Sequence, residues 1–78
     1  MNSIVFRDGF LSRVKASQGI KSDDAMARLL GVSRPTYLEL RDQRQSPSIA
    51  TMLAVYEAWG YTPGECVTVK VSAVKTAA

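Results

Sequence analysis

The stretch of chain that decides the fold runs from Asp23 to Asp42 and has the sequence DDAMARLLGVSRPTYLELRD. In its first half Met26, Ala27 and Leu30 recur at helical spacing, which predicts a short helix with one buried face. Gly31 predicts the end of that helix, because glycine accepts the positive φ of a sharp turn. A small residue such as Ala27 also suits a close crossing with a neighbouring helix. We therefore expect a tight turn at this point, with a second helix after it.

That second helix is predicted from Arg34 to about Asp42. Ser33 is placed to cap it, and Pro35 fits its first turn because the missing N–H of proline costs nothing there. Tyr37 and Leu40 follow at a spacing of three, which turns both toward the core. The start of the helix is left exposed.

Upstream of this pair, Phe6 to Gln18 is predicted to be a helix, because Phe6, Phe10, Leu11 and Val14 recur at helical spacing. Gly19 is placed to end it. The next helix is expected to be capped by Ser22, with acids in its first turn, where the macrodipole favours them.

Downstream, residues 43–48 are polar, contain Pro47 and predict a loop. A fourth helix ending at Gly60 is predicted after it. We expect its buried face to be one apolar stripe, made of Ile49, Met52, Leu53, Tyr56 and Trp59.

The period changes from helical to alternating after the turn signal Thr62-Pro63-Gly64, which predicts a half-buried strand from Glu65 to Val74. Its apolar face is expected to carry Val67, Val69 and Val71, with Thr68, Lys70 and Ser72 on the other face. Cys66 is expected on the Thr68 face as an unreactive thiol. A single strand needs a partner edge. The strand-forming run Ser3 to Phe6 is one candidate, a second copy of the same strand is the favoured one, and both pairings can occur together.

Composition excludes several classes of function. The chain has 78 residues, one cysteine and no histidine, so a disulfide-bonded, zinc-binding or histidine-dependent catalytic protein is not expected. We expect no enzyme activity, no metal, no cofactor and no small-molecule ligand. Apolar stretches are short, and Arg7, Asp8 and Arg13 interrupt the first twenty residues, so neither a membrane span nor a signal peptide is predicted. We expect a cytoplasmic protein. The net charge of +3 is compatible with a polyanionic partner.

Taken together, these residues resemble the lambda-repressor/Cro-type helix-turn-helix family. The resemblance covers roughly residues 7–61, and no insertion is needed to extend it through the fourth helix. It rests on matched positions along this stretch, namely Ala27, Gly31, Val32, Ser33, Tyr37, Leu40, Pro47, Met52, Leu53, Ala58, Trp59 and Gly60. It implies a mostly α fold, a bundle of four or five helices with a C-terminal β-strand, and a second helix of the Asp23–Asp42 pair that enters the major groove of double-stranded DNA.

The resemblance also implies the DNA-binding residues. Groove-facing positions are occupied by Ser33, Arg34, Pro35, Thr36 and Glu39, and phosphate-contacting positions by Arg41, Arg44 and Gln45. The guanidinium fork of Arg34 suits guanine O6 and N7, with a phosphate contact as the alternative. Arg44 is expected to contact a phosphate, and the alternative is a solvated cation in the loop. Glu39 is expected either to accept a hydrogen bond from the amino group of cytosine or to lie on a solvated face of the helix.

Three positions depart from the family pattern. Asp23 stands where a phosphate-touching glutamine is usual, so a DNA contact there is in doubt. Pro35 stands where a polar base reader is frequent, and it offers only apolar contact. Arg41 replaces a usual acid and adds positive charge.

The predicted function is a sequence-specific transcriptional regulator, most simply a Cro-like repressor. Residues 1–61 would form the DNA-binding domain, and residues 62–78 a strand and tail that joins a homodimer on a near-palindromic site. One alternative is the antitoxin of a toxin–antitoxin pair. Another is a protein-interaction module that does not bind DNA, a possibility supported by the acids Asp23, Asp24, Glu39 and Asp42.

Overall fold

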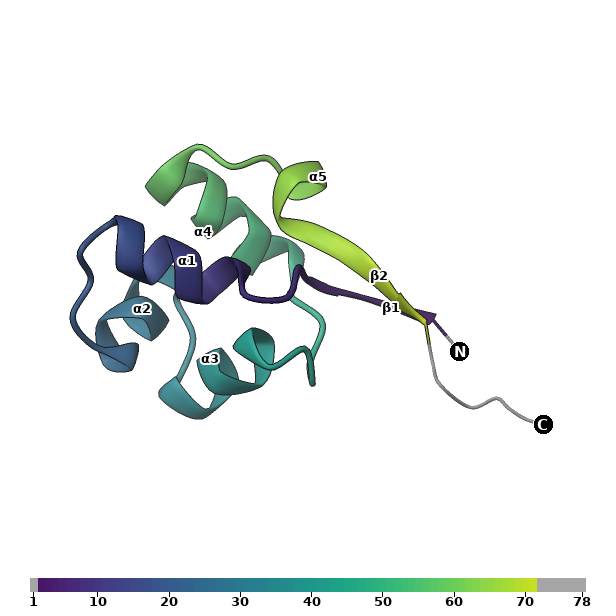
Figure 1. Ribbon diagram of the computed structural model, residues 1–78, viewed down its shortest axis with the longest axis horizontal. Helices are drawn as coiled ribbons and strands as arrows, with labels where there is room; N and C mark the ends of the chain where they lie inside the picture. Colours follow the sequence, from purple (N-terminus) through teal and green to yellow (C-terminus); the bar gives the residue numbers. More distant parts are fainter. Residues whose placement is uncertain (1, 72–78) are drawn as a thin grey trace.

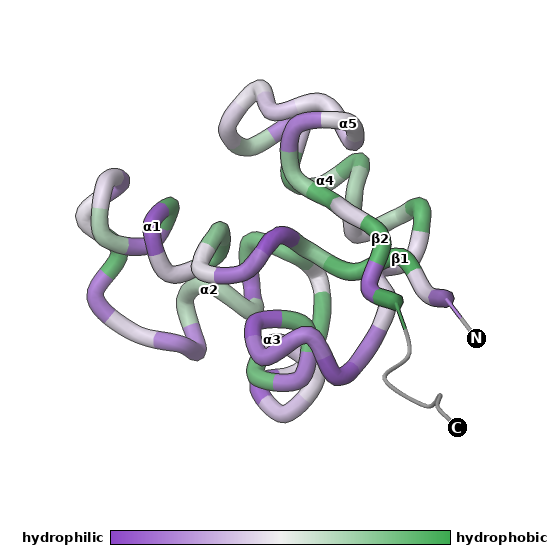
Figure 2. The backbone as a smooth tube through the Cα atoms, turned by 45° about the vertical axis from the view of Figure 1, so that its right-hand side comes forward, coloured by the Kyte–Doolittle hydropathy of each residue, from purple (hydrophilic) through white to green (hydrophobic). Residues whose placement is uncertain are grey.

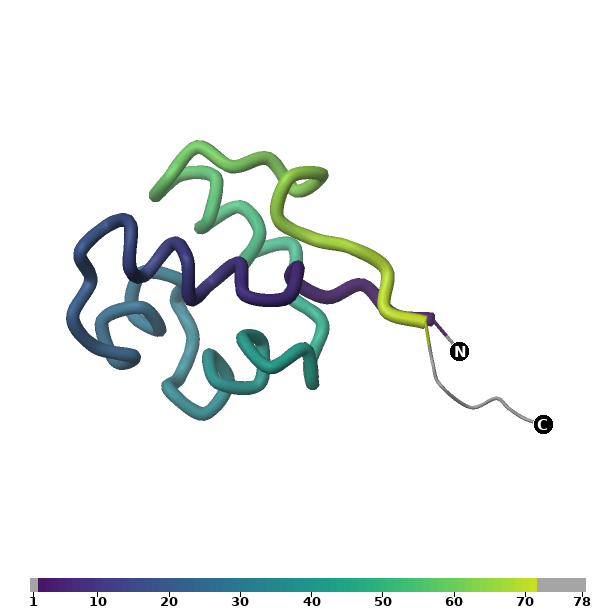
Figure 3. The backbone as a smooth tube through the Cα atoms, viewed as in Figure 1, coloured from purple at the N-terminus to yellow at the C-terminus, as the bar shows by residue number. Residues whose placement is uncertain are grey.

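The computed structural model describes residues 2–71 and consists of a helical body with a two-stranded antiparallel sheet (Figures 1 and 3). Five helices lie between the two strands along the chain. The elements in order are β1 (Asn2–Phe6), α1 (Phe10–Ser17), α2 (Asp23–Leu30), α3 (Arg34–Arg41), α4 (Ile49–Trp59), α5 (Pro63–Cys66) and β2 (Val67–Val71). The predicted fold class, mostly α with a C-terminal strand, is confirmed at this level.

Serine caps set the start of three helices, two of them as predicted. The hydroxyl of Ser22 accepts a hydrogen bond from the N–H of Ala25 at 3.1 Å, and that of Ser33 from the N–H of Thr36 at 3.3 Å. Ser48 begins α4 in the same way, with the N–H of Thr51 at 3.1 Å. Each cap satisfies a backbone donor that the helix itself leaves without a partner.

The core lies where the first four helices meet the base of the sheet. The inward-facing residues predicted for α2 and α3, Met26, Ala27, Leu30, Tyr37 and Leu40, are all buried. They pack with residues from the other elements, namely Phe6, Phe10, Leu11, Val14, Val55 and Cys66. The rings of Phe6 and Phe10 stack with their centroids 5.9 Å apart, which joins β1 to α1.

The predicted first helix is too long, because Phe6 belongs to a strand. β1 pairs with β2 over five residue pairs from Asn2–Val71 to Phe6–Val67, and α1 begins only at Phe10. Gly9, with φ of 75°, makes the turn between the strand and the helix. The apolar spacing of Phe6 and Phe10 is real, but it arises from two elements that share one core.

The outer part of the sheet extends past the helices, as both ribbon and tube show (Figures 1 and 3). Val5 and Phe6 are buried at its base, whereas Ile4, Val69 and Val71 are exposed. The expected half-buried valine face is therefore wrong beyond Val67, because no helix of the described chain covers it. Of the predicted strand 65–74, residues 72–74 lie outside the described residues.

Two further corrections concern the segment that precedes β2. Residues 63–66 form the short helix α5, so the strand begins at Val67 and not at Glu65. Cys66 is fully buried in that helix and does not lie on a strand face. Burial raises the pKa of its thiol, which agrees with the expected lack of reactivity.

The buried face of α4 also differs from the predicted stripe. Val55 and Thr51 are the buried residues of this helix, while Ile49, Leu53 and Tyr56 are 81%, 53% and 52% exposed. The hydroxyl of Thr51 accepts a hydrogen bond from the hydroxyl of Ser48 at 3.1 Å, so this buried polar group has a hydrogen-bond partner. Figure 2 shows hydrophobic positions along α4 and both strands. Those on α4 are not confined to one face.

Candidate nucleic-acid interface

The turn between α2 and α3 holds the two helices in close contact. Gly31 has φ of 72°, and the N–H of Val32 donates to the carbonyl of Ala27 at 3.0 Å. Ala27 is buried at the contact, where a larger side chain would push the helices apart. The turn and the contact thereby set the direction in which the start of α3 is presented.

The first residues of α3 face away from this contact. Ser33, Arg34 and Pro35 are exposed and Thr36 is half-buried. The Ser33 hydroxyl donates to the Thr36 hydroxyl at 3.0 Å and also caps the helix, so both hydroxyls are held in place. This end of the helix therefore combines one cation, two ordered hydroxyls and one apolar ring.

Arg34 and Glu39 project farther out. Arg34 lies beside Asp24 of α2, with 3.7 Å between Nε and the carboxylate oxygen, and the two side chains are 60% and 64% exposed. Glu39 is exposed, one turn farther along α3, and makes no ion pair within residues 2–71. Both side chains are exposed, but five residues along an α-helix separate them by roughly 140° around its axis.

Arg41 is held more tightly than the sequence predicts. Its guanidinium donates to both carboxylate oxygens of Asp42, at 3.0 and 3.4 Å, and lies 4.0 Å from Asp23. The hydrogen bond with Asp42 raises the pKa of Arg41 and lowers that of Asp42. A phosphate that approached Arg41 would have to compete with two acids of the chain itself.

Asp23 joins three helices. Its carboxylate accepts a hydrogen bond from Lys15 of α1 at 3.0 Å and also faces Arg41 of α3. The hydrogen bond from Lys15 is the main cause that lowers the pKa of Asp23 below its ordinary value. The half-buried carboxylate therefore acts as a counter-ion for both cations. Lys15 had no predicted role, because nothing local to its sequence links it to α2.

The loop after α3 carries the other two predicted residues. Arg44 and Gln45 are exposed, and no ion pair of Arg44 occurs in the described part of the chain. The loop and the sheet together line an open cleft of about 440 Å³. Lys70 of β2 also lines it and donates to the carbonyl of Gln43 at 2.9 Å. The structure therefore brings a second cation to Arg44 that sequence reasoning missed.

Gln43 connects the loop to the sheet. It has a backbone φ of 61°, in a region that residues other than glycine rarely adopt. Its side-chain amide donates to the carbonyl of Phe6 at 3.0 Å, while its own carbonyl accepts from Lys70. These contacts offset the unfavourable backbone, and they fix where Lys70 lies relative to the end of α3.

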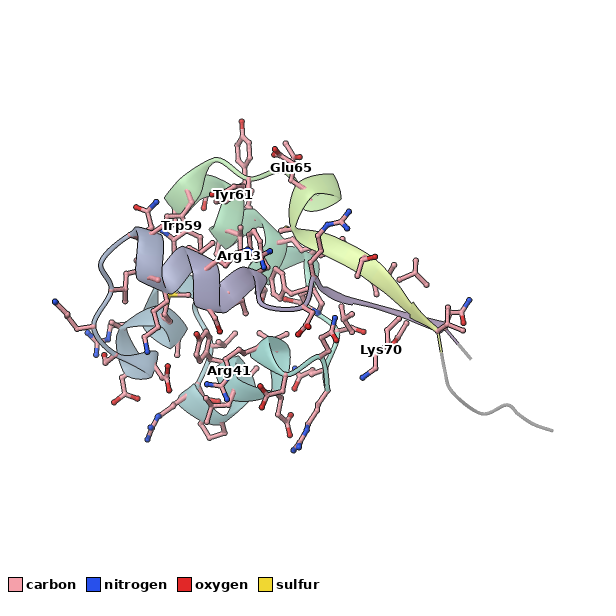
Figure 4. All side chains as sticks on the ribbon, in the orientation of Figure 1. Arg13, Arg41, Trp59, Tyr61, Glu65 and Lys70 are labelled. Carbon is pink, nitrogen blue, oxygen red and sulfur yellow. The ribbon has the colours of Figure 1, made fainter. Side chains whose placement is uncertain are left out.

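Two cations of this region, Arg41 and Lys70, lie on the side of the molecule that carries α3 (Figure 4). In the same view, Trp59, Tyr61 and Glu65 lie on the opposite side.

Tyr37 of α3 is buried in the core, as predicted. Burial raises the pKa of its hydroxyl, which has no hydrogen-bond partner among the described residues.

Comparison with family models, curated proteins and solved structures gives no match to this chain. Residues 2–71 contain no group of three or more cysteine, aspartate or glutamate side chains arranged to hold a metal ion. No helix of this part of the chain is long and apolar enough to span a bilayer.

Proposed function

We propose that the protein is a sequence-specific DNA-binding transcriptional regulator of the helix-turn-helix type, in which α3 enters the major groove. The observation that carries this proposal is the exposed start of α3, held by the tight contact with α2. None of Ser33, Arg34, Pro35 and Thr36 is among the buried residues of the core. An arginine fork with ordered hydroxyls beside it suits the hydrogen-bonding edges of bases.

The phosphate contacts in this proposal come from the loop after α3. Arg44 and Gln45 are exposed beside the groove-facing helix, and Lys70 adds charge to the same side. Contacts of this kind set the register of a protein on the duplex without reading sequence. Arg41 contributes less, because Asp42 and Asp23 already neutralise it.

The protein acts in this proposal as a Cro-like repressor that binds as a homodimer. Within the described chain β2 pairs only with β1, which leaves its second edge open to the same strand of another copy. Exposed Val69 and Val71 on this strand support such a contact. A twofold dimer would place two α3 helices about 34 Å apart on a near-palindromic site.

The function is tested by selecting bound duplexes from a randomised DNA pool. A conserved site with two half-sites one helical turn apart is the expected result. Enrichment of no sequence, together with equal binding to random DNA, would contradict sequence-specific recognition.

The dimer is tested by sedimentation of the whole chain. A double variant, Val69→Lys with Val71→Lys, should yield monomers, because charged side chains block pairing at a strand edge. Ile49→Lys, a matched change on the exposed face of α4, should leave the dimer intact. The reverse outcome would assign the interface to α4, and a monomeric wild type would contradict the dimer.

A second candidate function is a protein-interaction module on the same fold. The pairing of Arg34 and Arg41 with acids favours it, as do the exposed apolar residues Ile49, Leu53 and Tyr56. A gel shift at moderate salt separates the two functions. Absence of any shifted band, with random or selected DNA, would favour the interaction module.

A further inference from the structure

Two consecutive acids begin α2, and each faces a cation of α3. Asp23 is half-buried and pairs with Lys15 and Arg41, whereas Asp24 is exposed and pairs with Arg34. The contacts of Asp23 link helices of the core. The pair of Asp24 with Arg34 lies at the start of α3, where the proposed base-reading side chain is, and nothing in the packing of the core requires it.

The Asp24–Arg34 contact restrains a group that DNA would need. The carboxylate lies 3.7 Å from Nε, an exposed ion pair without a hydrogen bond, which favours the orientation of the side chain toward α2. A bidentate contact with guanine uses two N–H groups of the same fork and needs the side chain to extend from α3 into the groove. The two arrangements compete for one guanidinium.

We propose that Asp24 is a positioning residue that holds Arg34 against α2 in the free protein and competes with DNA for it. This inference rests on the proposed function. Because the competition acts through the base-reading contact, Asp24 lowers affinity for the cognate site more than affinity for random DNA. It thereby lowers the ratio of the affinity for the cognate site to the affinity for random DNA.

The experiment compares wild type and Asp24→Asn, as whole chains, on two duplexes of equal length. One is the tightest duplex selected from a randomised pool, and the other has random sequence. Asp24→Asn should bind the selected duplex about two- to fivefold more tightly, the range that an exposed ion pair is worth, and the random duplex with a smaller gain. In an Arg34→Ala background the same change should no longer favour the selected duplex.

Asp8→Asn is the matched control for charge. Asp8 is exposed and makes no ion pair within residues 2–71, so its loss should leave the ratio of the two affinities unchanged. Equal gains on both duplexes from Asp24→Asn, persisting without Arg34, would overturn the proposal in favour of a general charge effect. Weaker binding of Asp24→Asn would also overturn it, because Asp24 would then support the bound arrangement.

A measurement without DNA separates this inference from the proposed function. The Nε–H resonance of Arg34 in a ¹⁵N spectrum should shift in Asp24→Asn and stay in place in Asp8→Asn. An unchanged resonance overturns the contact itself. A shifted resonance in a protein that binds neither duplex establishes the contact but overturns the proposed function, and with it the competition.

Discussion

Helices α3 and α4 are neighbours in the chain. The buried face of α3 can be predicted from the sequence, whereas that of α4 cannot. In α3 polar and charged residues surround Tyr37, Leu38 and Leu40, so the inward side is defined by contrast. In α4 every residue except Thr51 and Glu57 is apolar, and Thr51 is itself buried. The comparison teaches that apolar spacing identifies a buried face only where the other faces are polar.

The largest expected effect is a difference in stability between two variants, each with one leucine changed, one on α3 and one on α4. Leu40→Ala should destabilise the protein by about 2–5 kcal/mol, since it leaves a cavity in the core, whereas Leu53→Ala should change stability by no more than about 0.5 kcal/mol. Urea denaturation of the two variants measures the difference. Equal losses would mean that α4 buries the face predicted from its spacing.

The outer faces of the two helices should differ in DNA binding. Arg34→Ala is expected to cost about 1–3 kcal/mol on a selected duplex and to spare random DNA, because base contacts carry the preference. Ile49→Ala, a change at an exposed position on α4, should leave both affinities unaltered. Fluorescence anisotropy on both duplexes gives the values. A loss that is the same on random DNA would make Arg34 a phosphate contact.

A smaller effect should distinguish the two arginines at the end of α3. Arg44→Ala should reduce the slope of log affinity against log salt by about 0.9, the value for one released counter-ion. Arg41→Ala should reduce it less, because Asp42 and Asp23 already neutralise this side chain. Titrations at several salt concentrations measure both slopes. A greater reduction for Arg41 would show that DNA displaces both acids.

The smallest effect concerns pH and the link between α2 and α3. The pKa of Asp23 is lower in the folded protein, chiefly through the hydrogen bond from Lys15. Its contribution to stability is therefore full above the unfolded value of about 3.9, and it is lost as pH falls through that value toward the lower folded pKa. The difference in urea midpoint between wild type and Asp23→Asn should be constant at neutral pH and shrink below about pH 4. A difference that grows on acidification would contradict the assigned direction.

Much of the α2–α3 pair can be predicted because its signals are local. A cap acts on an N–H three residues away, as Ser22 and Ser33 do, and Gly31 makes its turn within the same few residues. The exposure of Arg34 and Pro35 follows from the same local geometry. The predicted site residues therefore lie together on α3, its cap and the loop after it.

The sequence by itself determined where the helices from α2 to α4 begin and which residues of α2 and α3 face the core. Only the tertiary structure decided the strand pairing of residues 2–6 with 67–71, the buried face of α4, and the contacts of Asp23 and Lys70. The physical reason is distance along the chain. Caps and turns act over three or four residues, whereas these contacts form between segments that only folding brings together, and no local pattern encodes which partner each side chain meets.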